Sequence, residues 1–215
     1  IMAAEAGKDV HAQKPLAYSI AEGRAIVDAV KNYGIVWQTG SQQRSGSTFR
    51  FAAELVRNAR IGKVKHITVG LPEANSLNNH YTGEPTQIPA GFDYDMWLGP
   101  APHKPYNPGR CHWNFRWIRD YAGGQITDWA GHHVDIAHWA MGAEYTAPVE
   151  ISGTGEFPDH PLYDTVEHYS FHCQYAEGFT MDVVGATKYP RQKDGIQLTG
   201  VGENGGRGVL FEGSD

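Results

Sequence analysis

VHAQKPLAYSIAEGRAIVDAVKNYGIVWQ, residues 10–38, decides the fold class of this 215-residue chain. It begins with a short strand that leads into Lys14 and Pro15. Ser19 and Glu22 then have the spacing of a capping box at the start of a helix. An apolar stripe follows on that helix, a glycine ends it, and another strand begins directly afterwards. A strand, a helix and a strand in such close succession are typical of a parallel, doubly wound α/β sheet.

The next segments extend this pattern and then replace it. A second helix is predicted at about residues 49–59, and a strand at 64–71. Residues 72–122 then hold seven of the twelve prolines and show little periodicity. A connection of this length inside a compact domain is usually functional.

Alternation returns in the last third of the chain. Tyr169 and Cys173 share one face of a predicted strand, and residues 179–186 and 196–200 are predicted as its neighbours. Glu177 and Gly178 fit the hairpin turn between them. This part of the chain therefore predicts a mostly antiparallel sheet.

Composition excludes several classes of protein. The net charge is −6 and the basic residues form no block, which argues against a nucleic-acid partner. No stretch is apolar enough to predict a membrane span. Cys111 and Cys173 provide neither a disulfide framework nor a CxxC zinc motif. The first residues have no charged and apolar signal pattern, so we expect the chain to begin inside a domain.

The stretch GGQITDWAGHHVDIAHWAMG, residues 123–142, carries the clearest chemical pattern. If it is helical from about Asp128, then Asp128, His132, Asp135 and Trp139 lie on one face. A carboxylate one turn from an imidazole suits proton transfer, because it can fix the histidine tautomer and stabilise its cation. Two alternatives remain: a capping Asp128 with His132 in a core, or a metal site completed by another histidine.

A second candidate cluster comes from Lys14 and from the proline-rich connection. A lysine at the end of a parallel strand lies where open α/β sheets bind ligands, and a cis bond before Pro15 would turn Lys14 into the cleft. The connection adds indoles and guanidinium groups that suit a carbohydrate, although some of the indoles are expected in a core. These residues are Trp97, Trp113, Trp117, Trp129, Arg110 and Arg116.

GVGENG, residues 200–205, matches the dinucleotide pattern G-x-G-x-x-G. That pattern requires a helix directly after it, so that the helix N-terminus faces the pyrophosphate. Another strand follows here instead. We therefore interpret the segment as a glycine-rich hairpin.

Taken together and in order, five strings resemble the Gfo/Idh/MocA oxidoreductases. They are AGKDVHAQKPLA, AEGRAIVDAVKNYGIVWQTG, LVRNARIGKV, DMWLGPAP and the 123–142 stretch. The resemblance implies an α/β fold in which a remnant of a Rossmann-type dinucleotide-binding domain, residues 1–46, precedes an α+β domain. That domain, residues 47–215, would serve substrate binding and oligomerisation, would contain an open, mostly antiparallel sheet, and would be truncated at its C-terminus. The glycine-rich phosphate loop of the family would lie before residue 1.

The resemblance also assigns site residues. Lys14 matches the lysine of the family's E-K-P motif, and Asp128 and His132 match its D-x-x-x-H pair, so these three are the predicted catalytic residues. Gln13, Lys14 and Pro15 are the predicted cofactor contacts. Gln13 replaces the usual Glu and so removes a negative charge beside Lys14. The predicted substrate-binding residues are Arg116, Trp117 and His133, and no metal is predicted.

The implied function is hydride transfer between NAD or NADP and a sugar, polyol or sugar derivative. Two alternatives remain: glycoside cleavage through transient oxidation with retained NAD, or a catalytically incomplete fragment that only binds sugar. The expected partner is a small carbohydrate, with no nucleic acid and no membrane, and the open sheet would form a homo-oligomer. The compartment is not predicted: the cytoplasm is the default, and the periplasm applies if a twin-arginine signal precedes the chain.

Overall fold

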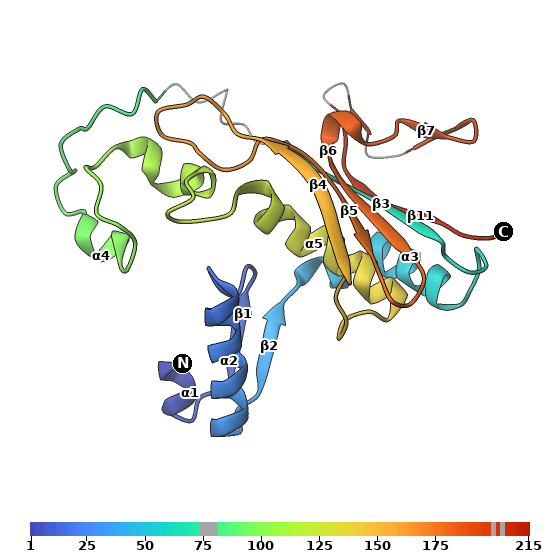
Figure 1. The fold of residues 1–215 in the computed structure, drawn as a ribbon. Coiled ribbons are helices and arrows are strands. Elements are labelled where there is room, and N and C mark those ends of the chain that lie inside the picture. Colours follow the sequence, from blue (N-terminus) through green and yellow to red (C-terminus); the bar gives the residue numbers. More distant parts are fainter. Residues whose placement is uncertain (74–80, 199–200, 203–204) are drawn as a thin grey trace.

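The computed structural model describes residues 1–73, 81–198, 201–202 and 205–215. A small N-terminal unit stands apart from a larger part built on a five-stranded sheet (Figure 1). The small unit approaches the long helix α5, Gly124–Met141, which lies along that sheet. Where the unit and α5 meet, Lys14 of the unit forms an ion pair with Asp128 of α5.

The N-terminal unit is the predicted parallel strand–helix–strand. β1 (Val10–Gln13) pairs in parallel with β2 (Trp37–Gly40), and α2 (Ile20–Tyr33) connects them. The short α1 (Met2–Glu5) packs against α2. Because the two strands run the same way, their carboxyl ends lie at one edge, which faces α5 (Figure 1).

Local capping fixes both ends of α2. The Ser19 hydroxyl accepts a hydrogen bond from the backbone N–H of Glu22 at 3.2 Å. The Glu22 carboxylate in return accepts from the backbone N–H of Tyr18 at 2.8 Å, one residue before the position that a standard capping box uses. Gly34 ends the helix in the left-handed conformation, with φ 62°. These bonds hold the loop between Lys14 and α2.

The main sheet has the strand order β11-β3-β6-β5-β4. Only the β3–β6 pair is parallel, so the predicted mostly antiparallel sheet is confirmed. Gly178, with φ 86°, forms the predicted turn between β5 and β6. The strands are β3 (His66–Leu71), β4 (Glu150–Glu156), β5 (His168–Gln174), β6 (Thr180–Gly185) and β11 (Gly208–Glu212).

One predicted neighbour in this sheet was wrong. Residues 196–197 form β8 (Ile196–Gln197), which pairs with β7 (Gln192–Lys193) in a separate hairpin. Ile196 is 69% exposed, so no buried face joins this strand to the main sheet. The strand β4, in contrast, had not been predicted. It is an exposed edge strand with two glycines, so no buried alternation marked it in the sequence.

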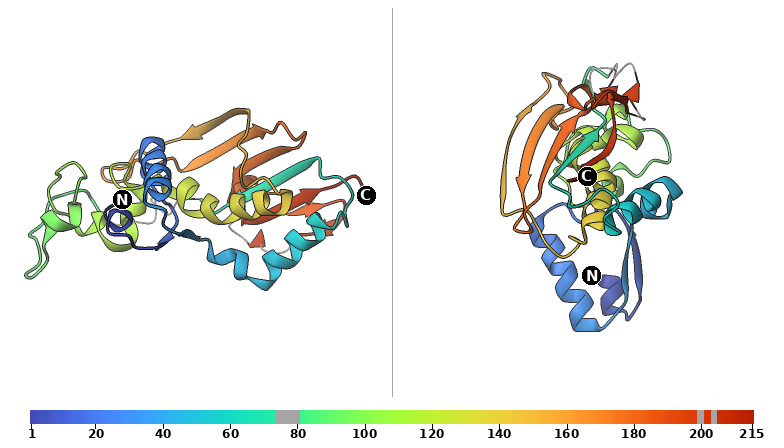
Figure 2. Two further views of the ribbon diagram at one scale, coloured as in Figure 1. Left: turned by 90° about the horizontal axis from the view of Figure 1, so that it is seen from below. Right: turned by 90° about the vertical axis from the view of Figure 1, so that its right-hand side faces the viewer.

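Helices cover one face of the sheet, and the other face is mostly polar, with Val184 and Leu210 also on it. The core lies between α5 and the sheet, with Ile67, Met181 and Val183 from the strands packed near Ala137. α3 (Ser47–Arg57) packs against α5 from the outside, as Figure 2 shows. In the described residues the opposite sheet face has no helix layer. It carries His66, Thr68, Ser170, His172, Thr180 and Asp182, all partly exposed.

α5 begins four residues before the predicted start near Asp128. Buried Gln125 donates to the backbone carbonyl of Glu73 at 3.1 Å, and Thr127 bonds back to the carbonyl of Gly124 at 3.2 Å. These tertiary and local bonds add one turn that the apolar pattern does not indicate. The helix ends at the left-handed Gly142, as expected of a C-terminal glycine.

The proline-rich connection is ordered by small aromatic cores. It contains α4 (Tyr94–Leu98) and the short 3₁₀ helices η3 (Pro108–Arg110) and η4 (His112–Trp117). Leu98 and Cys111 form one cluster with Tyr94, and several aromatic rings surround it. The connection therefore presents a defined surface beside the start of α5.

The described part of the glycine-rich match, residues 201–202 and 205, lies in a hairpin, as predicted. β9 (Val201–Gly202) pairs antiparallel with β10 (Gly205–Gly206). Residues 199–200 and 203–204 lie outside the described residues. An antiparallel strand occupies the place where a dinucleotide fingerprint needs a helix.

Candidate active site

Lys14 leaves the carboxyl end of β1 and reaches across to α5. The Lys14–Pro15 peptide bond is cis. The lysine side chain is 11% exposed, and its stem crosses α5 at Gly131. A Cβ at Gly131 would lie 2.8 Å from Cδ of Lys14, closer than two carbon atoms can pack. The glycine therefore creates the passage through which Lys14 reaches the helix.

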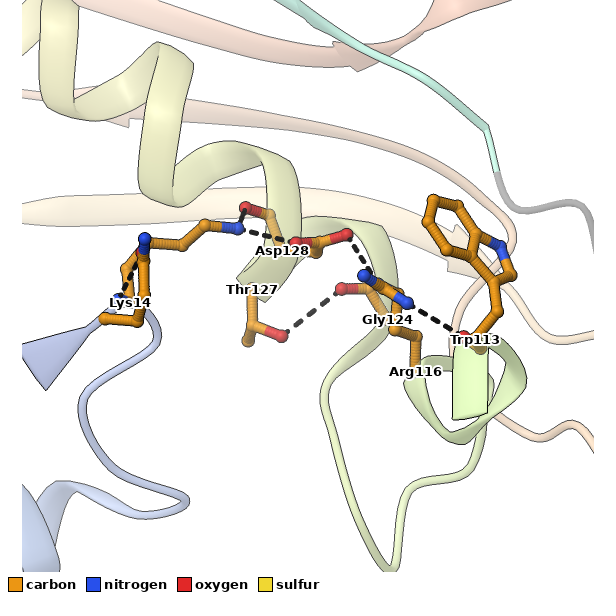
Figure 3. Close-up of polar contacts among 7 residues, drawn as sticks. Lys14, Trp113, Arg116, Gly124, Thr127 and Asp128 are labelled. Atoms are coloured by element: carbon orange, nitrogen blue, oxygen red, sulfur yellow. Dashed lines mark hydrogen bonds and ion pairs between the residues drawn. The ribbon is translucent and has the colours of Figure 1, made fainter. Parts of the chain in front are cut away.

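Asp128 is held between two cations. Its Oδ1 lies 2.5 Å from Nζ of Lys14, and its Oδ2 accepts from Nε of Arg116 at 3.1 Å (Figure 3). Nζ of Lys14 also donates to the backbone carbonyl of Asp128. Both carboxylate oxygens thus have charged partners, which fixes the side chain more firmly than one ion pair could.

Arg116 comes from η4 and brings the proline-rich connection into the cluster. Its Nη1 donates to the backbone carbonyl of Trp113 at 2.9 Å, and its guanidinium lies 4.1 Å from the centre of the Trp113 ring. Phe115 provides a second ring at 5.5 Å. The guanidinium is therefore anchored by Asp128 on one side and by aromatic faces on the other. Its predicted role as a substrate contact remains a prediction.

Gln13 uses its amide oxygen locally. That oxygen accepts from the backbone N–H of Lys14 at 3.2 Å. The negative charge that the family places before the lysine is thus absent, and Asp128 supplies a carboxylate to the ammonium instead. The departure from E-K-P does not leave Lys14 without a charged partner.

His132 lies one turn after Asp128 on the same helix. Burial lowers the pKa of its imidazole, and the positive charge of Lys14 lowers it further, while Asp128 and Asp135 raise it. The net shift is downward, which favours the neutral ring, the form that can accept a proton. The ring packs edge-on to Trp129 at 6.0 Å between centroids. Nδ1 is buried and has no hydrogen-bond partner among the described residues.

The capping alternative for Asp128 is wrong. The residue lies in the second turn of α5, and its carboxylate bonds to Lys14 and Arg116 rather than to the first backbone N–H groups. His132 is half-buried, and Lys14 of the N-terminal unit acts on its charge. His133, in contrast, is buried on the side of α5 that packs against the sheet. No group of three metal-ligating side chains occurs among the residues described.

Trp117 and His133, predicted as substrate-binding residues, are both buried in the structure. Trp117 is 2% exposed and packs with Ile118, Leu162 and Tyr163 in a small core. His133 is 4% exposed, and its Nδ1 lies 2.9 Å from the carbonyl oxygen of Gly70 in β3. Both side chains are buried by these packing contacts, and their predicted role as substrate contacts stays a prediction.

The structure adds an ion pair that the sequence analysis did not identify. Arg44, after β2, donates from Nε and Nη2 to the two carboxylate oxygens of Asp135 at 2.8 and 2.7 Å. The spacing had placed Asp135 on the face of Asp128 and His132. Only the partner was missing, because Arg44 is 91 residues away in the sequence.

An aromatic groove is lined by residues next to Lys14 and Asp128 in the sequence, although neither of these two side chains lines it. Two adjoining cavities of about 610 and 560 Å³ share four lining residues. The first cavity touches Pro15 and Thr127, the neighbours of Lys14 and Asp128, and the second reaches Trp97. The four shared residues are Tyr18, Glu22, Phe115 and Tyr121. None of them was predicted from the sequence, although Trp97 and other aromatic residues of the proline-rich connection were.

The strand edge below the cluster fits one end of a dinucleotide. Parallel sheets bind such cofactors outside the carboxyl ends of their strands, and β1 ends there with Gln13, Lys14 and Pro15. No G-x-G-x-x-G turn between a strand and a helix occurs in the described residues. The carboxyl end of β1 is thus the edge at which a parallel sheet meets such a cofactor, and the described residues contain no glycine-rich pyrophosphate turn of that kind.

Comparisons with known proteins give the family. A family model described as "Oxidoreductase family, C-terminal alpha/beta domain", of the Gfo/Idh/MocA group, matches residues 53–202. The scyllo-inositol 2-dehydrogenase (NAD(+)) of Bacillus subtilis (strain 168) is 26% identical over 208 residues. The match covers 95% of this chain and 49% of that enzyme, so the chain spans about half the length of this relative.

Solved structures agree on the fold. Levoglucosan dehydrogenase, in complex with NADH and levoglucosan, is 20% identical with a TM-score of 0.63, covering 99% of this chain and 47% of that one. The aldose-aldose oxidoreductase of Caulobacter crescentus, complexed with glycerol, is 20% identical with a TM-score of 0.58, covering 85% and 44%. With a family model that matches more than half of its residues, the chain belongs to the Gfo/Idh/MocA oxidoreductase family.

Proposed function

We propose that the whole protein transfers hydride between NAD or NADP and a sugar, polyol or sugar derivative. The observation that carries the proposal is the Lys14–Asp128–Arg116 ion-pair chain with a neutral His132 one turn away. The relatives named for inositol and levoglucosan oxidation support the same class of reaction. Residues 1–46 would contribute to the cofactor domain, and residues 47–215 would hold the substrate.

His132 would act as the base. A substrate hydroxyl loses its proton to the imidazole while hydride leaves the carbon that bears this hydroxyl, so that a carbonyl forms. The ammonium of Lys14 would polarise that oxygen, because a nearby cation stabilises the negative charge that develops there. Asp128 would orient Lys14, and Arg116 would hold Asp128 in turn.

The cofactor would approach from the carboxyl ends of β1 and β2. Gln13, Lys14 and Pro15 border this edge and would contact the nicotinamide end. When bound, the nicotinamide ring supplies the hydride acceptor. The choice between NAD and NADP depends on contacts to the adenosine ribose, far from this edge.

The aromatic groove would hold the remainder of a carbohydrate. Tyr18, Phe115, Tyr121 and Trp97 offer ring faces, and Glu22 offers a carboxylate for hydroxyl groups. Sugars bind well to such surfaces because their C–H faces stack on rings while their hydroxyls need directed partners. The cavity volumes lie within the range of about 300–1,000 Å³ typical of ligand sites.

The test is a substrate screen of the whole protein with NAD and NADP, followed through the absorbance of reduced nicotinamide. At least one sugar or polyol should be oxidised, and His132→Ala should lower kcat by about 10²–10⁴-fold, the usual contribution of a general base. His160→Ala is the matched control and should retain turnover, because the His160 ring bonds to the backbone of Leu162 and Tyr163 and not to Lys14, Asp128 or Arg116. Unchanged turnover in His132→Ala would rule out the mechanism.

A second candidate is glycoside cleavage through transient oxidation with retained NAD. The continuation of the groove through two adjoining cavities, lined by Pro15 in one and Trp97 in the other, favours it, because a glycoside has a second group to accommodate. Free sugar would then be released from a glycoside without net change in nicotinamide absorbance. Net reduction of added NAD by a free sugar or polyol would instead favour the dehydrogenase.

The polar face of the main sheet would form a homo-oligomer. It has no helix layer in the described residues, and His172 and Asp182 form a 2.5 Å contact on it. Sedimentation of the whole protein should show a dimer or larger assembly, and Ser170→Arg with Thr68→Arg should shift it toward monomer. An unchanged assembly in that double variant would place the interface elsewhere.

A further inference from the structure

A second ion pair joins the N-terminal side of the molecule to α5. Arg44 lies in the 3₁₀ helix η1 (Gln42–Ser45), in the connection between β2 and α3. It binds the Asp135 carboxylate through two parallel hydrogen bonds of 2.8 and 2.7 Å. This fork geometry fixes both side chains in orientation as well as in distance.

Further contacts hold Arg44 in place. Its guanidinium lies 5.5 Å from the centre of the Trp139 ring, and Nη1 is 3.7 Å from the carboxylate of Glu144. Arg57 of α3 donates to the backbone carbonyl of Trp139 at 2.7 Å. The connection after β2 is thus tied to the last turns of α5 through a network rather than through one exposed pair.

The two ion pairs flank His132. Lys14 meets Asp128 four residues before the histidine, and Arg44 meets Asp135 three residues after it. On a helix, these spacings place both carboxylates on the face of the histidine. One cation comes from the end of β1 and the other from just beyond β2, the two neighbouring parallel strands.

We propose that Arg44 is a positioning residue for the reaction assigned above: through Asp135 it fixes α5 over the strand ends and controls the charge that His132 experiences. The proposal rests on the proposed function for its catalytic consequence. The electrostatic part concerns this chain alone, so it can be tested without substrate.

The charges around His132 explain the expected signs. Lys14 faces it from the end of β1, and Asp128 and Asp135 face it from α5. Arg116 neutralises Asp128 from η4, and Arg44 neutralises Asp135 from η1. His133 is the adjacent titratable group, and it is buried toward the sheet.

The first experiment follows the ring proton of His132 by NMR during a pH titration of this chain. Arg44→Gln leaves the Asp135 charge without its partner, so the pKa of His132 should rise. Asp135→Asn removes a neighbouring negative charge, so the pKa should fall. The neutral double variant should lie between the two single variants. Arg50→Gln, which breaks an exposed pair with Glu54 on α3, should leave the titration unchanged.

A purely structural pair would not give shifts of opposite sign. If the two single variants move the titration in the same direction, or not at all, the electrostatic role of Arg44 is wrong. The ring proton of His133 serves as a check on folding in each variant, because its buried environment depends on the packing of α5 against β3.

The second experiment measures kcat and KM in the whole protein. Arg44→Gln should lower kcat by about tenfold with a smaller effect on KM for the sugar, because a misplaced base costs orientation in the reacting complex. Arg44→Lys keeps the positive charge but loses the two parallel hydrogen bonds to Asp135. The pKa of His132 should therefore stay closer to that of the unmodified protein than kcat does. Normal kcat in Arg44→Gln would overturn the positioning role. Absence of any nicotinamide-dependent turnover in the unmodified protein would reject the proposed function and leave the titration result standing.

Discussion

The two faces of α5 give adjacent histidines opposite environments. His132 lies on the face of Asp128 and Asp135, where charged side chains from the N-terminal unit and its connection surround it. His133 lies on the face toward the sheet, where it binds the backbone of β3 and packs near Phe49. Burial lowers the pKa of both rings, yet of the two only His132 has Lys14, Asp128 and Asp135 acting on its charge. A lowered pKa therefore does not by itself identify a functional histidine.

The largest effect on stability should come from the sheet-side histidine. His133→Ala removes the partner of the Gly70 carbonyl and opens a gap beside Phe49, so the free energy of unfolding should fall by about 1–3 kcal/mol. Urea denaturation of this chain measures it. His132→Ala, the matched variant on the other face, should cost much less. Equal losses from the two variants would remove the distinction between the faces.

Gly131→Ala should separate stability from activity. Alanine favours a helix over glycine by about 0.5–1 kcal/mol, but its methyl group would collide with the Lys14 stem. We expect an unchanged or higher unfolding free energy and a fall in kcat of about tenfold in the whole protein, since Lys14 must shift. Gly23→Ala in α2 meets only a distant Ala17 Cβ at 3.9 Å, so it should gain stability without losing turnover. Full activity in Gly131→Ala would show that the approach of Lys14 to α5 is not needed.

The smallest effect is a dependence of stability on pH. Burial lowers the pKa of His133 and of His138 below the ordinary value of 6.5. Between the lowered and the ordinary pKa the unfolded chain binds more protons than the folded chain. The unfolding free energy should therefore be fully present above about pH 6.5 and should decline as the pH falls below it. Thermal unfolding at several pH values measures the slope, which His133→Leu should reduce. A slope that this variant leaves unchanged would exclude His133 as its source.

The pH dependence of catalysis should come from His132, whereas the pH dependence of stability comes from His133 and His138. His132 must be neutral to accept a proton, so kcat/KM of the whole protein should lose activity on the acid side, below the ordinary histidine pKa. In His132→Ala this acid limb should disappear from the residual activity. In His133→Leu it should persist.

Local sequence determined the elements and their polarity. The capping residues around Ser19, the glycine ends at Gly34 and Gly142, and the alternation at Tyr169 and Cys173 predicted helices and strands that the structure contains. These features depend on neighbours within a few residues, so a short window is sufficient. The same helical periodicity places Asp128, His132 and Asp135 on one helix face.

Tertiary structure decided which side chains meet and which are covered. Arg44 pairs with Asp135, and Arg116 pairs with Asp128. The Lys14 stem packs against Gly131, and Trp117 is buried in a small core. The sequence did not predict these contacts, because most of them join segments that are distant in the chain. Helical periodicity fixes the direction of a side chain relative to its own helix. It contains no information about what lies opposite, and that information arises only when the N-terminal unit, the proline-rich connection and the sheet pack around α5.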